Sequence, residues 1–204
     1  TSGLKTTGVA TFEGNKARIV TGGDGQNGSM WFTKPLAKNT SFEMYADISG
    51  FTAGYSVVLQ STTNGTSLPA GGYGDKDTLK RKNAVVVQIS GGKGGGQVGA
   101  AKLEVAANGQ VVKTLGSFLP SNTNQLPRRI WLNYDHDTTT LRVYAGAAGG
   151  QKPASPNTSV KSNVWGFLGA NGQPTYAGFT AGNASAGVNG NKYVDRWALY
   201  YQAP

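Results

Sequence analysis

The stretch RRIWLNYDHDTTTLRVYAG, residues 128–146, is the most regular part of the chain and decides the fold class. Apolar residues alternate with other residues on both sides of the polar run DHDTTT, as in two β-strands that each bury one face. Asp and Thr side chains bond to nearby backbone amides and therefore favour turns. The stretch predicts an antiparallel hairpin, with strands at 129–134 and 141–145 and the single histidine, His136, at its tip.

Strand signals recur along the rest of the chain. They predict strands at 9–13, 16–20, 29–32, 41–48, 55–60, 84–89, 101–106, 110–115, 175–181 and 192–201. No amphipathic helix, internal repeat or linker stands out. The sequence therefore predicts an all-β fold, an antiparallel β-sandwich or jelly roll, in a single domain over residues 1–204.

Composition narrows the class of protein. The 204 residues include 31 glycines and no cysteine, and 14% are charged, which suits short strands joined by many turns. The lack of cysteine excludes disulfides, thiol catalysis and cysteine-ligated zinc. Without an apolar stretch of about 18 residues, no membrane insertion is expected. The Thr/Asn/Gly-rich profile fits a secreted protein or one on a cell or virion surface.

The net charge of +9 allows two interpretations. The basic residues, which cluster at 80–82 and 128–129, either keep the protein soluble or attract an acidic polysaccharide through a basic surface. The basic runs lack the interleaved aromatic residues on which single-stranded nucleic acids stack, and no nucleic-acid-binding motif is present. No nucleic-acid partner is predicted.

Candidate catalytic residues are few. A Ser-His-Asp triad would need His136, but Asp135 and Asp137 beside it are turn-forming residues. Glu43 and Asp47 share one face of a predicted strand, as paired glycosidase carboxylates do, and the opposite face is apolar. We therefore expect Glu43 and Asp47 to face solvent. The sequence predicts that the protein is not an enzyme.

Several motifs resemble those of the L-type (legume-type) lectins. The hairpin Trp-Leu-Asn-Tyr-Asp…Leu-Arg-Val-Tyr resembles the family's hairpin, and four further segments resemble other family strands and loops in the family's order: 29–36, 51–60, 71–74 and 83–90. Residues 175–199 resemble its last strands, with a Tyr-x-Gly-Phe-Thr-Ala segment and a later Trp. The resemblance spans nearly the whole chain and implies the concanavalin A-like sandwich of two large antiparallel sheets.

The resemblance implies carbohydrate binding without catalysis, in a shallow bowl built from four loops that calcium and a transition metal hold in place. Position by position, however, the family's sugar-binding Asp falls on Ala53, and its metal-binding Glu and Asp fall on Gln88 and Ser90. The loop at 91–97 offers no carboxylate, although calcium sites usually include several oxygen ligands of that kind. No metal cofactor is therefore expected. Calcium stays an alternative only through Asp75 and Asp77.

The remaining loop residues could bind a sugar if their loops converge. The predicted ligand-binding set is Gly72, Tyr73, Asp75, Asp77, Asn183 and Asn189. Asp and Asn side chains bond to sugar hydroxyls, and an aromatic face receives the C–H groups of the sugar ring. The expected partner is a glycan or glycoprotein, and a homo-oligomer is left open.

Three alternatives stay open beside the lectin hypothesis. The predicted ligand residues could be ordinary solvated loop residues. The sandwich could have lost sugar binding and serve as a structural or protein-contact module of an adhesin or virion. The run Gln88-Ile89-Ser90 also resembles the Gln-Ile-His strand of alginate lyases, but Ser90 stands where their catalytic His would be.

The four tryptophans, Trp31, Trp131, Trp165 and Trp197, lie in or beside apolar segments. We expect them to pack in the protein rather than to stack on a ligand. Residues 165–168 are predicted to tuck a loop onto the sandwich.

Overall fold

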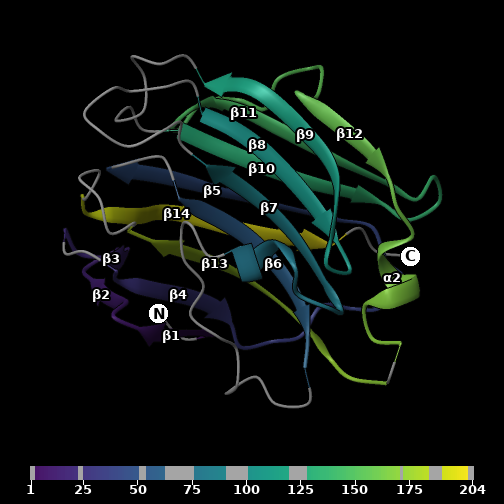
Figure 1. The fold of residues 1–204 in the computed structure, drawn as a ribbon, viewed down its shortest axis with the longest axis horizontal. Coiled ribbons are helices and arrows are strands. Elements are labelled where there is room, and N and C mark those ends of the chain that lie inside the picture. Colours follow the sequence, from purple (N-terminus) through teal and green to yellow (C-terminus); the bar gives the residue numbers. More distant parts are fainter. Residues whose placement is uncertain are drawn as a thin grey trace.

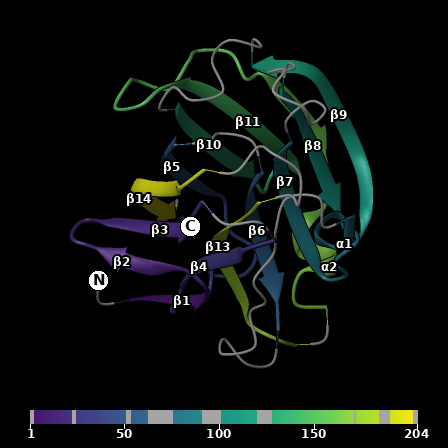
Figure 2. The same cartoon turned by 60° about the vertical axis from the view of Figure 1, so that its left-hand side comes forward.

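The fold is a sandwich of two antiparallel seven-stranded sheets (Figures 1 and 2). The computed structural model describes residues 3–22, 25–50, 54–62, 76–90, 101–119, 128–170, 172–183 and 190–201. The predicted all-β antiparallel sandwich is confirmed. Among the helices of these ranges, none is long and apolar enough to cross a membrane.

One sheet, called the front sheet here, has the order β1-β4-β13-β6-β7-β8-β9. Its strands are β1 (Leu4–Gly8), β4 (Asn27–Phe32), β13 (Thr175–Gly182), β6 (Tyr55–Ser61), β7 (Ala84–Ser90), β8 (Ala101–Ala107) and β9 (Gln110–Leu119). The short helix α1 (Lys76–Leu79) contacts β7 and β8.

The other sheet, called the back sheet, has the order β12-β11-β10-β5-β14-β3-β2. Its strands are β12 (Thr158–Lys161), β11 (Thr140–Ala147), β10 (Arg128–Asp135), β5 (Phe42–Gly50), β14 (Lys192–Tyr201), β3 (Lys16–Val20) and β2 (Thr11–Glu13). The second short helix, α2 (Val164–Phe167), lies at the right-hand end of the molecule in Figure 1.

Every strand predicted from the sequence overlaps a strand of the structure, and two strands were missed. These two, β1 and β12, have the sequences LKTTG and TSVK, which show no run of alternating apolar residues. Each is the outermost strand of its sheet. Such strands form because a neighbour offers a ladder of backbone hydrogen bonds, which a local pattern cannot reveal.

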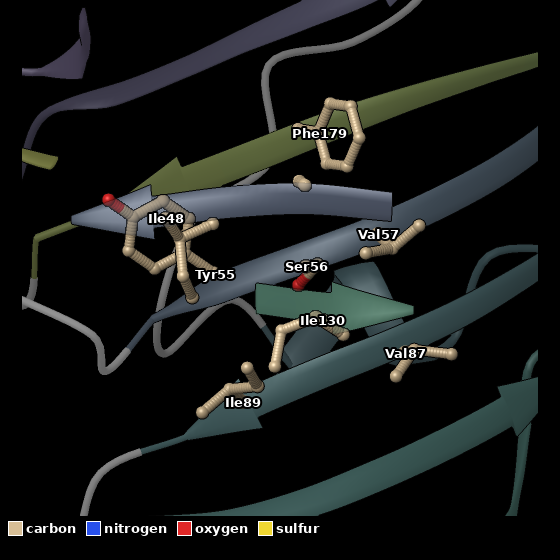
Figure 3. A pocket seen from close by; sticks show the side chains of 9 residues that line it. Ile48, Tyr55, Ser56, Val57, Val87, Ile89, Ile130 and Phe179 are labelled. Carbon is tan, nitrogen blue, oxygen red and sulfur yellow. The ribbon is translucent and has the colours of Figure 1, made fainter. Parts of the chain in front are cut away.

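Alternating side chains of the two sheets form one core. Its largest fully buried members include Met30, Phe42, Met44, Leu59, Leu103, Leu132, Tyr134, Leu141 and Phe179. A cavity of about 10 Å³ remains between the sheets, lined by Ile48 and Ile130 from the back sheet and by Val87, Ile89 and Phe179 from the front sheet (Figure 3). A space this small and apolar is a packing defect and not a ligand site.

The β10–β11 hairpin forms as predicted. Asp135 pairs with Thr140, which leaves the four residues 136–139 as the turn. The backbone N–H of Thr138 donates to Asp135 Oδ1 at 3.0 Å, and this bond holds the pKa of Asp135 below its ordinary value. Thr139 adopts a φ of +47° to close the turn. Asp135 is thus a turn-forming residue, and His136 lies in the turn.

Three tryptophans are buried, but only one of them packs between the sheets. Trp165 of α2 contacts Phe42 edge-on at 6.3 Å, and its Nε1 donates to Thr40 O at 3.0 Å, so this loop does tuck onto the sandwich. Trp31 lies on the outer face of the front sheet across from Gly178, where a Cβ would meet the indole ring at 2.3 Å. Trp131 lies on the outer face of the back sheet.

Candidate ligand-binding end of the sandwich

One end of the sandwich gathers most of the long connections. We call it the loop end: there β5, β7 and β13 finish and β6, β8 and β14 begin. The register shows this directly, because Gly50 pairs with Lys192, Ala181 with Tyr55, and Ser90 with Lys102. The chain segments that follow β5, β7 and β13 therefore all leave the sheets at the same end.

Asn183 is the centre of a hydrogen-bonded cluster at the loop end. Its side-chain Nδ2 donates to Thr21 O at 2.6 Å, and its Oδ1 accepts a hydrogen bond from Lys192 Nζ at 2.5 Å. Its backbone N–H donates to Gln26 O at 2.9 Å. One side chain thus joins the ends of β3 and β13 to the start of β14.

Lys192 is an unusual residue for the interior of a sandwich. Only 1% of its surface is exposed, since its side chain runs inward from the first residue of β14. Burial lowers the pKa of Lys192 from its ordinary 10.5 to about 8, because an ammonium group loses its hydration when it is enclosed. The group is still mostly protonated at neutral pH, so it places a cation just inside the loop end.

Two further contacts stiffen this end. The Tyr55 hydroxyl of β6 lies 2.7 Å from Ser49 O and 3.0 Å from Tyr193 O, so a front-sheet residue bonds to two back-sheet strands. Gly50 has a φ of +82°, and a Cβ there would lie 2.0 Å from Asn191 O. Only glycine allows β5 to end this close to the chain entering β14.

The structure places two of the predicted ligand residues, and it places them far apart. Asn183 lies at the loop end, 3% exposed and with its side chain bonded as described. Asp77 lies in α1. Lys80, just beyond α1, has its carbonyl oxygen 2.6 Å from where a Cβ of Gly109 would lie, in the β8–β9 turn at the opposite end of the front sheet. Gly72, Tyr73, Asp75 and Asn189 lie outside the described residues.

The positions that correspond to the family's metal ligands do not fit a metal. Gln88 is 5% exposed, and its Oε1 has no hydrogen-bond partner among the described residues. The nearest acid across the strands, Glu104, pairs with Gln88 in the register and forms an ion pair with Lys102 at 3.0 Å. Within the described ranges, no group of three or more His, Cys, Asp or Glu side chains is placed to hold a metal ion. A neutral amide and a serine lack the charge that calcium sites usually contain.

Gln88 belongs to a row of polar side chains that sequence reasoning missed. Directly paired positions on four adjacent strands carry Ser29, Thr180, Ser56 and Gln88, each at most 5% exposed. Within the part of the chain that the structure describes, Thr180 Oγ1, like Gln88 Oε1, has no hydrogen-bond partner. The four residues are far apart in the sequence, and only the strand register aligns them across the outer face of the front sheet.

Glu43 and Asp47, which share a strand face as paired glycosidase carboxylates do, are each bound to a basic side chain. Glu43 and Asp47 do lie on the outer face of the back sheet, but the expectation that both face solvent is wrong for Asp47, which is 3% exposed. Asp47 binds the guanidinium of Arg129, and the N–H of Gly149 also donates to it at 3.3 Å. Glu43 forms an ion pair with Lys152. The segment after β11 therefore contacts both acids, through the N–H of Gly149 at Asp47 and through Lys152 at Glu43.

Solved lectin structures share this fold over almost the whole chain. Lectin II from Ulex europaeus has a TM-score of 0.74 at 12% identity, and the match covers 99% of this chain and 94% of that chain. Lectin I-B4 from Griffonia simplicifolia, in its metal-free form, has a TM-score of 0.73 at 10% identity, with 98% and 94% covered. The winged bean acidic lectin in complex with methyl-α-D-galactose has a TM-score of 0.71 at 14% identity, with 100% and 94% covered.

Comparison of the sequence with models of protein families finds no match, and comparison with curated proteins finds none. At identities of 10–14% the structural likeness establishes the fold alone. It confirms the predicted concanavalin A-like sandwich, which is the fold of these lectins.

Proposed function

We propose that this protein recognises carbohydrate without catalysis, through the loops at the loop end of the sandwich. The observation that carries the proposal is the convergence of chain ends there: β5, β7 and β13 finish and β6, β8 and β14 begin at this end, and hydrogen bonds of Asn183 join the ends of β3 and β13 to the start of β14. Binding loops mounted on a rigid sheet are the usual way in which a sandwich presents ligand-binding side chains.

The cluster supports this function by holding loop ends in place. Because Asn183 and Tyr55 bond to backbone carbonyls of neighbouring segments, the loops start from fixed positions. Asn189 belongs to the segment between β13 and β14, and its amide is suited to sugar hydroxyls. Gly72, Tyr73 and Asp75 are left out of the set proposed for the loop end, because Asp77, two residues after Asp75, lies in α1 at the opposite end of the front sheet.

The proposed recognition is independent of divalent metal. The support for this is the donor set: Gln88 and Ser90 stand where the resemblance implies carboxylate ligands. In place of a metal ion, the Lys192 ammonium and its bond to Asn183 join the strand ends. A secreted or surface location is part of the proposal and rests on composition alone.

A glycan array tests the function directly. The array is read at physiological salt with calcium and again with a chelator. We expect binding of a neutral glycan that persists in both conditions. Loss of binding with the chelator would overturn the metal independence, and the absence of any bound glycan would overturn the function. The variant Asn189→Ala should weaken binding about tenfold, the loss expected for one good polar contact.

A matched control comes from the opposite end of the molecule. Asp137→Asn changes a polar residue in the β10–β11 turn, at the end of the back sheet opposite the start of β14. This variant should bind the same glycan as strongly as the wild type. An equal loss in Asp137→Asn would show that the effect of Asn189→Ala is not local.

A second candidate function, protein contact, has one observation in its favour. Strand β9 is one of the two outermost strands of the front sheet. On it, Val111 is 48% exposed and Val112 is 45% exposed. Exposed apolar residues on an outermost strand favour pairing with another chain. Sedimentation analysis of the wild type and of Val112→Lys tests it: a mass above the monomer that the variant abolishes would support the contact module.

A further inference from the structure

A second surface with the chemistry of a sugar site lies on the outer face of the back sheet. Ala198 of β14 pairs with Tyr45 of β5, and Tyr200 and Arg196 lie two positions to either side of Ala198. Because side chains alternate along a strand, Arg196, Ala198 and Tyr200 share the outer face, while Trp197 and Leu199 pack toward the core. Ala198 has the smallest side chain of the three.

The two tyrosine rings, Tyr45 and Tyr200, lie next to each other beside Ala198. Their centroids are 6.3 Å apart and their planes differ by 31°. Tyr200 is 55% exposed, whereas Tyr45 is half-buried, with the Arg129 guanidinium over its ring, 4.4 Å from the ring centre. The exposed ring of Tyr200 is suited to the C–H side of a pyranose ring.

Arg196 supplies an exposed cation on this face. It makes no ion pair with the described residues. The carboxylate opposite it, Asp47, has both oxygens bound by Arg129, at 2.6 and 2.7 Å. Three other cations on this face, Lys16, Arg142 and Lys152, each have an acidic partner, and Lys161 donates to Thr138 O at 2.6 Å. An exposed planar guanidinium is suited to a carboxylate, which it can bind through two parallel hydrogen bonds.

The backbone beside these side chains is also open. The strand β3 pairs with β14 only from Lys192 to Val194. From Arg196 onward, the edge of β14 that faces away from β5 has no partner strand among the described residues. Its N–H and C=O groups can therefore bond to hydroxyl groups of a ligand that lies along the strand.

We propose that Tyr45, Tyr200 and Arg196 form a second carbohydrate site, which binds a carboxylated sugar unit of an acidic glycan. The sugar ring lies on the tyrosine faces above Ala198, its carboxylate pairs with Arg196, and its hydroxyls reach the open edge of β14. Tyr200 is eight residues from Lys192, about 26 Å along the strand. The site is therefore separate from the loop end, and the proposal does not depend on the function proposed there.

Calorimetric titration with a matched pair of ligands tests the site. The first ligand is a tetrasaccharide of α-1,4-linked galacturonic acid, and the second is the same tetrasaccharide with its carboxyl groups reduced to alcohols. At physiological salt, which screens long-range attraction, the wild type should bind the acidic form at least tenfold more tightly than the reduced form. Arg196→Gln should abolish that preference, and Tyr200→Ala should weaken binding of both forms about tenfold.

Two variants control for charge and for aromatic content. Lys16→Gln removes one positive charge from the same face, and Tyr201→Ala removes an exposed tyrosine that follows Tyr200 on the other side of the strand. Both should leave the Kd within twofold of the wild type. All four positions are exposed, so thermal unfolding should show native stability.

Three outcomes would overturn the site. One is no binding of the acidic tetrasaccharide by the wild type. Another is an equal loss in Arg196→Gln and Lys16→Gln, which would reduce the effect to overall charge. The third is wild-type self-association that Tyr200→Ala abolishes, which would assign the face to a second copy of the chain. Binding of neutral glycan at the loop end should be unchanged in Arg196→Gln, so failure of one site is distinguishable from failure of the other.

Discussion

Arg129 on β10 and Asp47 on β5 form a two-pronged ion pair, with Nε 2.6 Å and Nη2 2.7 Å from the two carboxylate oxygens. The pair is nearly enclosed, since the side chains are 12% and 4% exposed. Arg129 also donates to Gly150 O at 3.2 Å and stacks on Tyr45. One interaction therefore ties together two strands, the segment after β11 and Tyr45 of the second proposed site.

Breaking this pair should destabilise the protein strongly. Asp47→Ala leaves a guanidinium enclosed without its partner, which costs about 3 kcal/mol of unfolding free energy. Glu43→Ala removes the partner of Lys152 in a half-exposed pair on the same strand, and it should cost less than about 1 kcal/mol. Urea unfolding of both variants measures the difference.

The double variant Asp47→Leu with Arg129→Met should recover much of the loss, because replacing both charges removes the unpaired one. If Asp47→Ala and Glu43→Ala lower the unfolding free energy by the same amount, the enclosed Arg129–Asp47 pair does not stabilise the protein more than the half-exposed Lys152–Glu43 pair.

The buried Lys192 should make stability depend on pH. Burial lowers its pKa to about 8 from 10.5. Between these two values the unfolded chain binds a proton that the folded chain does not, so folding becomes more favourable as pH rises. The cost of the buried charge is present in full below pH 8 and is relieved by pH 10.5. The unfolding free energy of the wild type should therefore rise relative to that of Lys192→Met across this interval.

Chemical unfolding of the two proteins at neutral and alkaline pH measures this difference, and other titrating groups cancel in the comparison. Parallel pH profiles of wild type and Lys192→Met would contradict a lowered pKa. Asn183→Asp places a carboxylate beside the ammonium, so it should reduce the pH dependence by favouring the charged lysine.

The unpaired amide oxygen of Gln88 should cost stability. A buried acceptor without a partner loses its hydration and gains no bond, so Gln88→Met should stabilise the protein by about 1 kcal/mol. Gln60 on the neighbouring strand is the matched control, because its Nε2 donates to Ser61 O and Lys82 O, both at 3.1 Å. Gln60→Met should destabilise. Loss of stability in both variants would mean that the Gln88 amide is satisfied by water.

The cavity between the sheets should accept one additional methyl group. Val87 lines it and is 1% exposed. Val87→Ile keeps a β-branched residue in the strand and adds one buried CH₂, for a gain of about 0.8 kcal/mol. Thermal unfolding measures the gain. A fall in melting temperature would show that the core is already full at this point, since overpacking forces side chains from their preferred rotamers.

Much of the strand layout could be predicted because its signal is local. The alternation in residues 129–134 and 141–145 follows from a pleated strand with one buried face, and the polar run between them predicts the turn that is observed. The lectin-like order of motifs correctly predicted the sheet architecture. Strands β1 and β12 were missed because they depend on a neighbouring strand.

The candidate sites could be predicted far less well. Asn183 was expected to be a loop ligand, and the structure shows its side chain bonded within the cluster at the loop end, while Asp77 lies at the other end of the front sheet. Lys192 and Arg196 both lie on β14. No local sequence pattern shows that Lys192 is buried or that Arg196 forms no ion pair with the described residues.

Residue type and spacing were enough to establish which side chains share a strand face, since that depends only on the two-residue period of the backbone. Which faces meet, and therefore whether a charge is hydrated, paired or enclosed, depends on contacts between strands distant in the chain. Asp47 and Arg129 are 82 residues apart, and Asn183 and Thr21 are 162 apart. The fold follows from a repeating local pattern, whereas the sites follow from the register of strands that only the folded sandwich brings together.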